Sequence, residues 1–121
     1  MTFPSISVKA TNMTLTPELQ HLLDQKLQPL GKFLHEHGDT KCDVELERVA
    51  EHQSGKIFRA EINLFNGGKL YRAEATEDQI EKAIDAARNE LRHELQHLHG
   101  KQHSLVQRGR RAIKDMLRFG R

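Results

Sequence analysis

A long amphipathic segment from Thr76 to Lys101 constrains the fold of this chain more than any other feature. Its apolar residues recur at intervals of three and four, the spacing that gathers side chains on one face of an α-helix. They are Ile80, Ala83, Ile84, Ala87, Leu91, Leu95 and Leu98. Thr76 followed by Gln79 predicts the start of the helix, and Gly100 predicts its end. Such a helix needs a partner surface to cover its apolar face.

Composition limits what the chain can be. Its 121 residues suffice for one domain with a single modest core. No apolar run of 18 residues is present, and Met1 to Ala10 does not resemble a signal peptide, so we expect a soluble, cytoplasmic protein with no membrane partner. The single cysteine, Cys42, cannot form an internal disulfide and alternates with strand residues as a small core side chain would. No nucleophile constellation or glycine-rich phosphate loop is present, which predicts no enzymatic activity and no cofactor.

Four short segments carry apolar residues at every second position, the pattern of half-buried β-strands. They cover residues 6–10, 42–46, 58–64 and 69–75. Thr16-Pro17 predicts the start of a helix that is interrupted at Pro29, continues to Leu34 and is closed by Gly38. Asn66-Gly67-Gly68 supplies the positive-φ residues of a tight hairpin turn.

The predicted order of elements is therefore β-α-β-β-β-α, an α+β fold with one four-stranded sheet. The first two strands, joined through a helix, should be parallel, and the later pairs antiparallel. Both helices should cover one face of the sheet and leave the other open. We expect residues 1–101 to form this domain, and residues 102–121 to form a basic tail that is disordered or a short amphipathic helix.

Charge is distributed unevenly along the chain. Residues from Arg88 to Arg121 carry nine Lys or Arg against three acids, which gives +6, and residues 1–87 carry −4. This segregation favours a polyanion as the partner of the C-terminal third, although a basic tail can also serve solubility alone. One row of the long helix has spacings of four, four and three that suit RNA phosphates, or else it is an ordinary solvated face paired with acids such as Glu81 and Asp85. The row consists of Arg88, Arg92, Gln96 and His99.

The run from Phe58 to Gly68, together with Ala73-Glu74-Ala75 and Ala83-Ile84-Asp85, resembles the bacterial ribosome hibernation-promoting factors, also called ribosome-associated inhibitor A or ribosome subunit-interface proteins. The resemblance covers roughly residues 5–101. It implies a fold like that of double-stranded-RNA-binding domains and binding to the small ribosomal subunit and its 16S rRNA. It also implies occupation of the mRNA channel and the A and P tRNA sites, and so steric inhibition of translation in stress and stationary phase. From the length of 121 residues we expect no counterpart of the dimerisation domain of longer members, and we expect a monomer off the ribosome.

The predicted RNA-binding residues combine basic positions that the resemblance implies with basic residues of the long helix and the tail. They are Lys26, Lys32, Arg88, Arg92, His93, His97, Lys101, Arg108, Arg110, Arg111, Lys114 and Arg118. At three positions where family members are typically basic, this chain has Glu90, His93 and His97 instead.

A competing motif lies in the same helix. Residues 93–103 satisfy H-E-x-x-H-x-x-G-x-x-H, in which His93, His97 and His103 would bind zinc, with Glu94 as general base and a turn at Gly100. However, His93 and His97 lie roughly opposite the apolar stripe, and the chain has no second lobe to form a cleft. We therefore favour a ribosome-binding inhibitor with no catalytic residues and only adventitious metal binding at these histidines. The alternatives are a generic structured-RNA-binding module and, more remotely, a zinc metallohydrolase.

Overall fold

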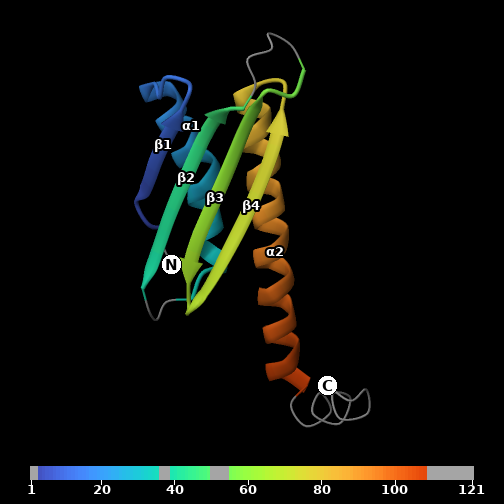
Figure 1. Ribbon diagram of the computed structural model, residues 1–121. Helices are drawn as coiled ribbons and strands as arrows, with labels where there is room; N and C mark the ends of the chain where they lie inside the picture. Colours follow the sequence, from blue (N-terminus) through green and yellow to red (C-terminus); the bar gives the residue numbers. More distant parts are fainter. Residues whose placement is uncertain (1–2, 36–38, 50–54, 109–121) are drawn as a thin grey trace.

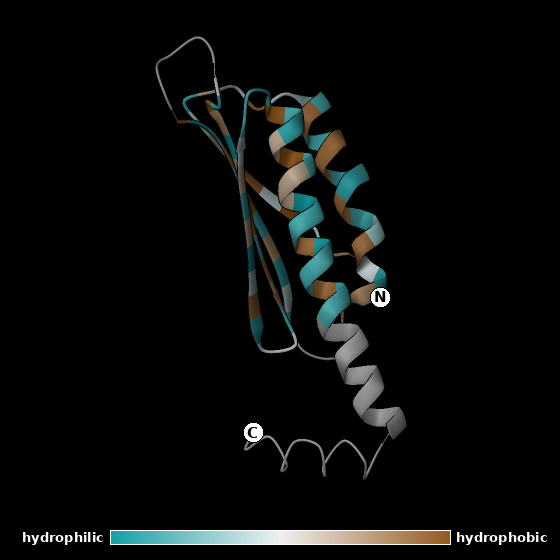
Figure 2. Cartoon of the chain, turned by 90° about the vertical axis from the view of Figure 1, so that its right-hand side faces the viewer, coloured by the Kyte–Doolittle hydropathy of each residue, from teal (hydrophilic) through white to brown (hydrophobic). Residues whose placement is uncertain are grey.

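The computed structural model describes residues 3–35, 39–49 and 55–108, and the side chains of these as far as His97. The elements follow one another as β1 (Ile6–Thr11), α1 (Pro17–Leu27), the 3₁₀ helix η1 (Gln28–Phe33), β2 (Thr40–Arg48), β3 (Phe58–Asn66), β4 (Lys69–Glu77) and α2 (Ile80–Arg108). The strands form one layer, and both helices lie behind it (Figure 1). An edge-on view shows α1 and α2 on the same side of the sheet (Figure 2). The predicted α+β class and order of elements are confirmed.

The sheet has the strand order β1-β2-β3-β4. β1 pairs with β2 in parallel, and the pairs β2–β3 and β3–β4 are antiparallel, as expected from the connections. Alternation along β2 and β3 directs Val44 and Ile62, which are register partners, towards the helices. Neither helix packs on the opposite face, which we call the open face (Figure 2).

The first helix begins and ends where the sequence predicts. The Thr16 hydroxyl accepts a hydrogen bond from the backbone N–H of Leu19 at 3.2 Å, and Pro17 is the first helical residue. The α-helical hydrogen bonding of α1 stops at Leu27, and the chain continues as η1 through Pro29, because proline supplies no backbone donor. Gly38, the predicted end of this region, lies outside the described residues.

The core is built between the helices and the helix-facing side of the sheet. The predicted stripe of α2 is buried from Ile80 to Leu95, while the side chain of Leu98 is not among those described. The largest fully buried apolar side chains of the core are Leu23, Leu27, Leu30, Val44, Leu46, Ile62, Leu64, Ile84 and Leu91. No helix among the described residues is both long and apolar enough to cross a membrane.

The predicted ends of the long helix were wrong. β4 continues through Thr76, whose register partner is Arg59, so Thr76 is a strand residue and not a helix cap. The Gln79 carbonyl instead accepts the hydrogen bond from the Ala83 N–H at 3.1 Å, and α2 begins at Ile80. At its other end α2 continues through Gly100 to Arg108. A glycine inside a helix costs only about 1 kcal/mol relative to alanine, and no proline follows it, so Gly100 does not end the helix.

Candidate nucleic-acid interface

An ion pair between the helices shows which side of α2 faces α1. Lys26 Nζ of α1 lies 2.9 Å from Asp85 Oδ1 of α2. At about 100° per residue, Arg88 lies roughly 60° and Arg92 roughly 20° from Asp85 around the α2 axis. Both arginines therefore lie on the flank of α2 that faces α1 and η1. We call this surface the helix flank, and define it by Lys26, Arg88 and Arg92 with the exposed Lys32 of η1.

The arginines of the helix flank are not neutralised by any described side chain. Arg88 is half-buried, and its Nη1 donates to Asn89 Oδ1 at 3.0 Å, while its buried Nε has no hydrogen-bond partner among the described atoms. Asp85 is used by Lys26, and within the part of the chain with described side chains no carboxylate forms an ion pair with Arg88 or Arg92. The structure thus gives no support to the alternative in which this row is paired with Glu81 and Asp85.

His93 and His97 lie on a different flank of α2. His97 follows Arg88 by nine residues, which places it about 180° around the helix axis. With Glu90 and Glu94 the two histidines line one open hollow on the surface. The predicted residues therefore do not form a single patch, because the structure separates the histidines from Arg88 and places them beside two acids.

The remaining predicted residues lie at or beyond the end of the described side chains. Lys101 and Arg108 are placed on the C-terminal half of α2 by its backbone, but their side chains are not described. Arg110, Arg111, Lys114 and Arg118 lie outside the described residues.

The zinc-protease motif does not acquire its expected geometry. The motif requires a turn at Gly100, yet α2 passes through this residue as a continuous helix. His103 therefore follows His97 by six helical residues, which separates their backbone positions by about 9 Å along the axis. Among the described residues, no three His, Cys, Asp or Glu side chains are placed to hold a metal ion. The predicted turn at Gly100 was therefore wrong, and adventitious metal binding at His93, His97 and His103 stays a prediction.

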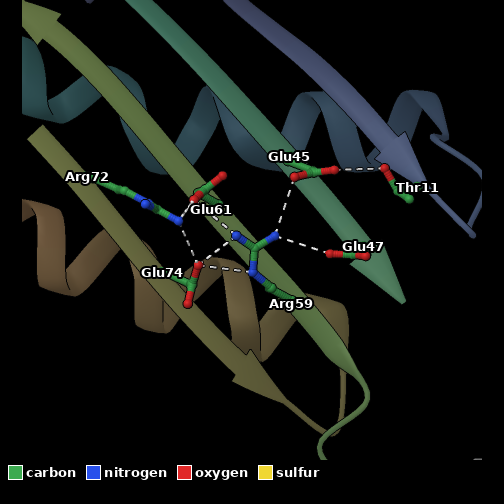
Figure 3. Close-up of polar contacts among 7 residues, drawn as sticks. All are labelled: Thr11, Glu45, Glu47, Arg59, Glu61, Arg72 and Glu74. Atoms are coloured by element: carbon green, nitrogen blue, oxygen red, sulfur yellow. Dashed lines mark hydrogen bonds and ion pairs between the residues drawn. The ribbon is translucent and has the colours of Figure 1, made fainter. Parts of the chain in front are cut away.

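The open face carries a network of charged side chains that the sequence analysis missed (Figure 3). Arg59, with a 17% exposed side chain, lies at its centre, and its Nη2 lies 2.6 Å from Glu74 and 3.0 Å from Glu61. Its Nη1 lies 3.2 Å from Glu47 and 3.4 Å from Glu45. Arg72 also pairs with Glu61 and Glu74, as Figure 3 shows. The signal in the sequence was the recurrence of acids at the outward positions of β2, β3 and β4.

Mutual stabilisation keeps these groups charged. The hydrogen bond between Arg59 and Glu74 is the main cause that raises the pKa of Arg59. The same hydrogen bond is the main cause that lowers the pKa of Glu74, and a hydrogen bond from the Thr11 hydroxyl, at 2.8 Å, is the main cause that lowers the pKa of Glu45. Because both carboxyl pKa values are depressed, the stabilisation is present at neutral pH and is lost as the pH falls through the folded values. The guanidinium donors are thus directed at carboxylates, and the centre of the open face is unsuited to phosphate.

The sequence analysis also missed the hydrogen bonds of the Asn66 side chain, which connect the hairpin to the start of β2. Asn66 is 1% exposed, and its Oδ1 accepts a hydrogen bond from the His35 N–H at 2.8 Å. Its Nδ2 donates to the His35 carbonyl at 3.1 Å and to Thr40 Oγ1 at 2.9 Å. The predicted tight turn is confirmed, because Gly67 and Gly68, at φ 62° and 79°, supply its positive-φ residues between β3 and β4.

Residues 6–103 match the profile of the family described as Sigma 54 modulation protein / S30EA ribosomal protein. This chain belongs to that family. The match confirms the resemblance seen between Phe58 and Asp85, and the family is one of ribosomal and modulation proteins rather than of enzymes. No curated protein sequence matches the chain closely enough to count as a relative.

Solved structures share the fold. The N-terminal domain of Protein Y from Thermus thermophilus is 22% identical, with a TM-score of 0.61, and the match covers 81% of this chain and 99% of that one. A ribosomal subunit interface protein from Coxiella burnetii is 16% identical, with a TM-score of 0.59, over 77% of this chain and 94% of that one. At these sequence identities the structural similarity establishes the fold alone, whereas the profile match establishes family membership.

Proposed function

We propose that this protein binds the small ribosomal subunit in the mRNA channel and the A and P tRNA sites, and inhibits translation by steric exclusion. The observation that carries the proposal is the family match over residues 6–103, whose description is ribosomal. A structure of the same fold is titled a ribosomal subunit interface protein. The protein then acts in the cytoplasm, on 16S rRNA, as a monomer and without catalysis.

The helix flank is the surface that best fits rRNA. Arg88 and Arg92 have no ion-pair partner among the described side chains, so their charge is free to neutralise phosphates. Lys26, which is paired with Asp85, and the exposed Lys32 add basic groups from α1 and η1, which both contact α2. Contacts of this kind fix position and orientation on RNA without reading sequence, which suits occlusion of a channel.

The open face supports this choice by exclusion. A flat sheet can bind RNA when exposed aromatic residues and free cations lie at its centre. Here the centre holds Arg59, which is already surrounded by carboxylates, and Arg72, which is paired with two of the same acids. Four glutamates surround two arginines there, so a phosphate would meet net negative charge, and we place the primary contact on the helix flank.

The basic C-terminal region extends this interface in our proposal. The α+β domain over residues 1–101 supplies the helix flank, and residues 102–121 supply further cations. Lys101 and Arg108 lie on the C-terminal half of α2, and Arg110, Arg111, Lys114 and Arg118 follow in sequence. We assign His93 and His97 a secondary role, because Glu90 and Glu94 share their flank.

A double charge reversal tests the assignment. Arg88→Glu with Arg92→Glu should lower affinity for isolated small subunits at least tenfold near physiological salt, and should flatten the dependence of log affinity on log salt by about 1.5. The matched control is Lys9→Glu with Lys82→Glu, which changes the net charge equally but lies on β1 and at the start of α2. The affinity of the control variant for small subunits should fall by less than about threefold.

Thermal unfolding of both variants shows whether a loss of affinity comes from a loss of folded protein. Both should melt close to the wild type, because none of the four side chains belongs to the core. If the two variants lose the same affinity, the helix flank has no special role, and only net charge matters. If the wild type binds unrelated structured RNA as tightly as small subunits, the protein is a generic RNA-binding module instead.

A further inference from the structure

The open face ends in an apolar corner beside the β3–β4 hairpin. Phe65 is 39% exposed and Leu70 is 59% exposed, and the two are register partners across β3 and β4. Lys41 of β2 is the partner of Phe65 on its other side. These three residues form one row across three strands, which we call the hairpin patch. Phe65 lies between the buried Leu64 and Asn66 in sequence, so its side chain points away from the core.

The hairpin patch differs in charge from the centre of the open face. The Lys41 side chain is exposed, and its ion-pair contact with Asp43 is long, at 3.8 Å. Lys69 at the start of β4 alternates with Leu70 and lies on the side of Tyr71, whose ring centre is 5.0 Å from its Nζ, so it does not belong to the patch. The four carboxylates around Arg59 lie on rows farther from the hairpin. This corner therefore combines an exposed aromatic ring with one nearby cation, Lys41, whereas the centre of the open face combines acids with arginines that are already paired.

The position of the corner connects it with the interface proposed above. α2 runs antiparallel to β4 and continues past the β3–β4 hairpin (Figure 1). The C-terminal end of α2, at Arg108, therefore lies beyond the same end of the sheet. An RNA strand that follows the basic C-terminal half of α2 would pass close to Phe65 and Lys41.

We propose that the hairpin patch is a second RNA contact, in which an unpaired base stacks on Phe65 while Lys41 meets an adjoining phosphate. The proposal rests on the ribosomal function proposed above. Unpaired bases of folded RNA are commonly bound on aromatic side chains, and every base offers a π-face for such stacking. The carboxylates around Arg59 confine the strand to the hairpin end, so the contact takes one or two nucleotides and not a long segment.

The first test measures affinity for small subunits with four variants. Phe65→Ala should weaken binding at least fivefold, as truncation of a stacking aromatic typically does. Phe65→Tyr should bind within about twofold of wild type, whereas Phe65→Leu should behave as Phe65→Ala does. Val49→Ala is the matched control, because Val49 is 43% exposed, follows the far end of β2 and should have no effect.

Wild-type affinity in Phe65→Ala would overturn the proposal while leaving the ribosomal function intact. Full retention of affinity in Phe65→Leu would also overturn it, since an aliphatic side chain preserves a hydrophobic contact with a ribosomal protein but cannot stack. A wild-type dimer that dissociates in Phe65→Ala, seen by sedimentation equilibrium, would assign the patch to a second copy of this chain and overturn the proposal too.

A second test does not depend on the ribosome. A single-stranded RNA dodecamer with one central 2-aminopurine reports stacking by loss of fluorescence. The full-length wild type and Phe65→Tyr should quench it at low salt, and Phe65→Ala and Phe65→Leu should need at least fivefold more protein for the same quenching. Equal quenching by all four proteins overturns the stacking contact. If quenching follows Phe65 but no protein binds small subunits, the stacking contact stands and the ribosomal function falls.

Discussion

Replacement of Asn66 by alanine should destabilise the fold more than its position beside a hairpin turn suggests. The side chain is 1% exposed and makes three hydrogen bonds, two to the His35 backbone and one to Thr40 Oγ1. Each intramolecular hydrogen bond contributes about 1 kcal/mol net, and a buried polar group left unpaired costs more. His35 is exposed, so water can replace part of what is lost. We expect Asn66→Ala to lower the free energy of unfolding by about 2–3 kcal/mol.

Urea denaturation followed by circular dichroism measures this loss. The matched control is Asn63→Ala, which lies on the same strand but points to the open face and should cost less than about 0.5 kcal/mol. Asn66→Asp keeps an acceptor for the His35 N–H but removes the donor to the His35 carbonyl and Thr40. It should therefore cost at least as much as Asn66→Ala at neutral pH, because a buried carboxylate then faces a carbonyl. An Asn66→Ala protein within 0.5 kcal/mol of wild type, by the same assay, refutes the role of these hydrogen bonds.

Three further predictions concern the tail, the cysteine and the histidines. Residues 109–121 carry five Lys or Arg against one Asp, so truncation after Arg108 changes the net charge from +2 to −2. The truncation should leave the melting temperature nearly unchanged and lower small-subunit affinity at least tenfold. It should also flatten the slope of log affinity against log salt by about two to four. Burial, and secondarily Asp43, raises the pKa of Cys42 to about 12, so at pH 8 iodoacetamide should label it only in urea, and rapid labelling of the folded protein would contradict its burial. Since the described core contains no histidine, a strong chelator should leave the thermal transition unchanged, and its collapse would reveal a structural metal.

Much of the fold could be predicted because buried side chains recur in the sequence at the period of their helix or strand. The stripe from Ile80 to Leu95 and the alternation in the strands report which side chains face the core, and both were confirmed. Thr16 and Pro29 act through their own backbone neighbours, so their effects on α1 were also predictable.

The ends of α2 depended on competition that the sequence does not resolve. Thr76 suits either a helix cap or a strand, and pairing with Arg59 in the sheet decides for the strand. Gly100 can end a helix or lie inside one, and the difference is about 1 kcal/mol. Local signals of this size are easily overridden by the surrounding structure.

The candidate site depended on contacts between residues distant in sequence. Asn66 meets His35, which lies 31 positions earlier, and Arg59 gathers carboxylates from three strands. Periodicity placed Arg88 and His97 on the surface of one helix, but only the packing of α1 shows which flank faces η1. The sequence therefore predicted that α2 carries candidate RNA-binding residues, but not that they divide into a basic flank and a histidine-bearing flank.

Competition with tRNA tests the central claim most directly. Affinity of the wild-type protein for isolated small subunits should be measured with and without saturating tRNA in the A and P sites, by sedimentation of a labelled protein. We predict mutual exclusion, in which tRNA raises the apparent Kd in proportion to its own concentration. Simultaneous binding of protein and both tRNAs, with an unchanged Kd, would contradict the steric mechanism.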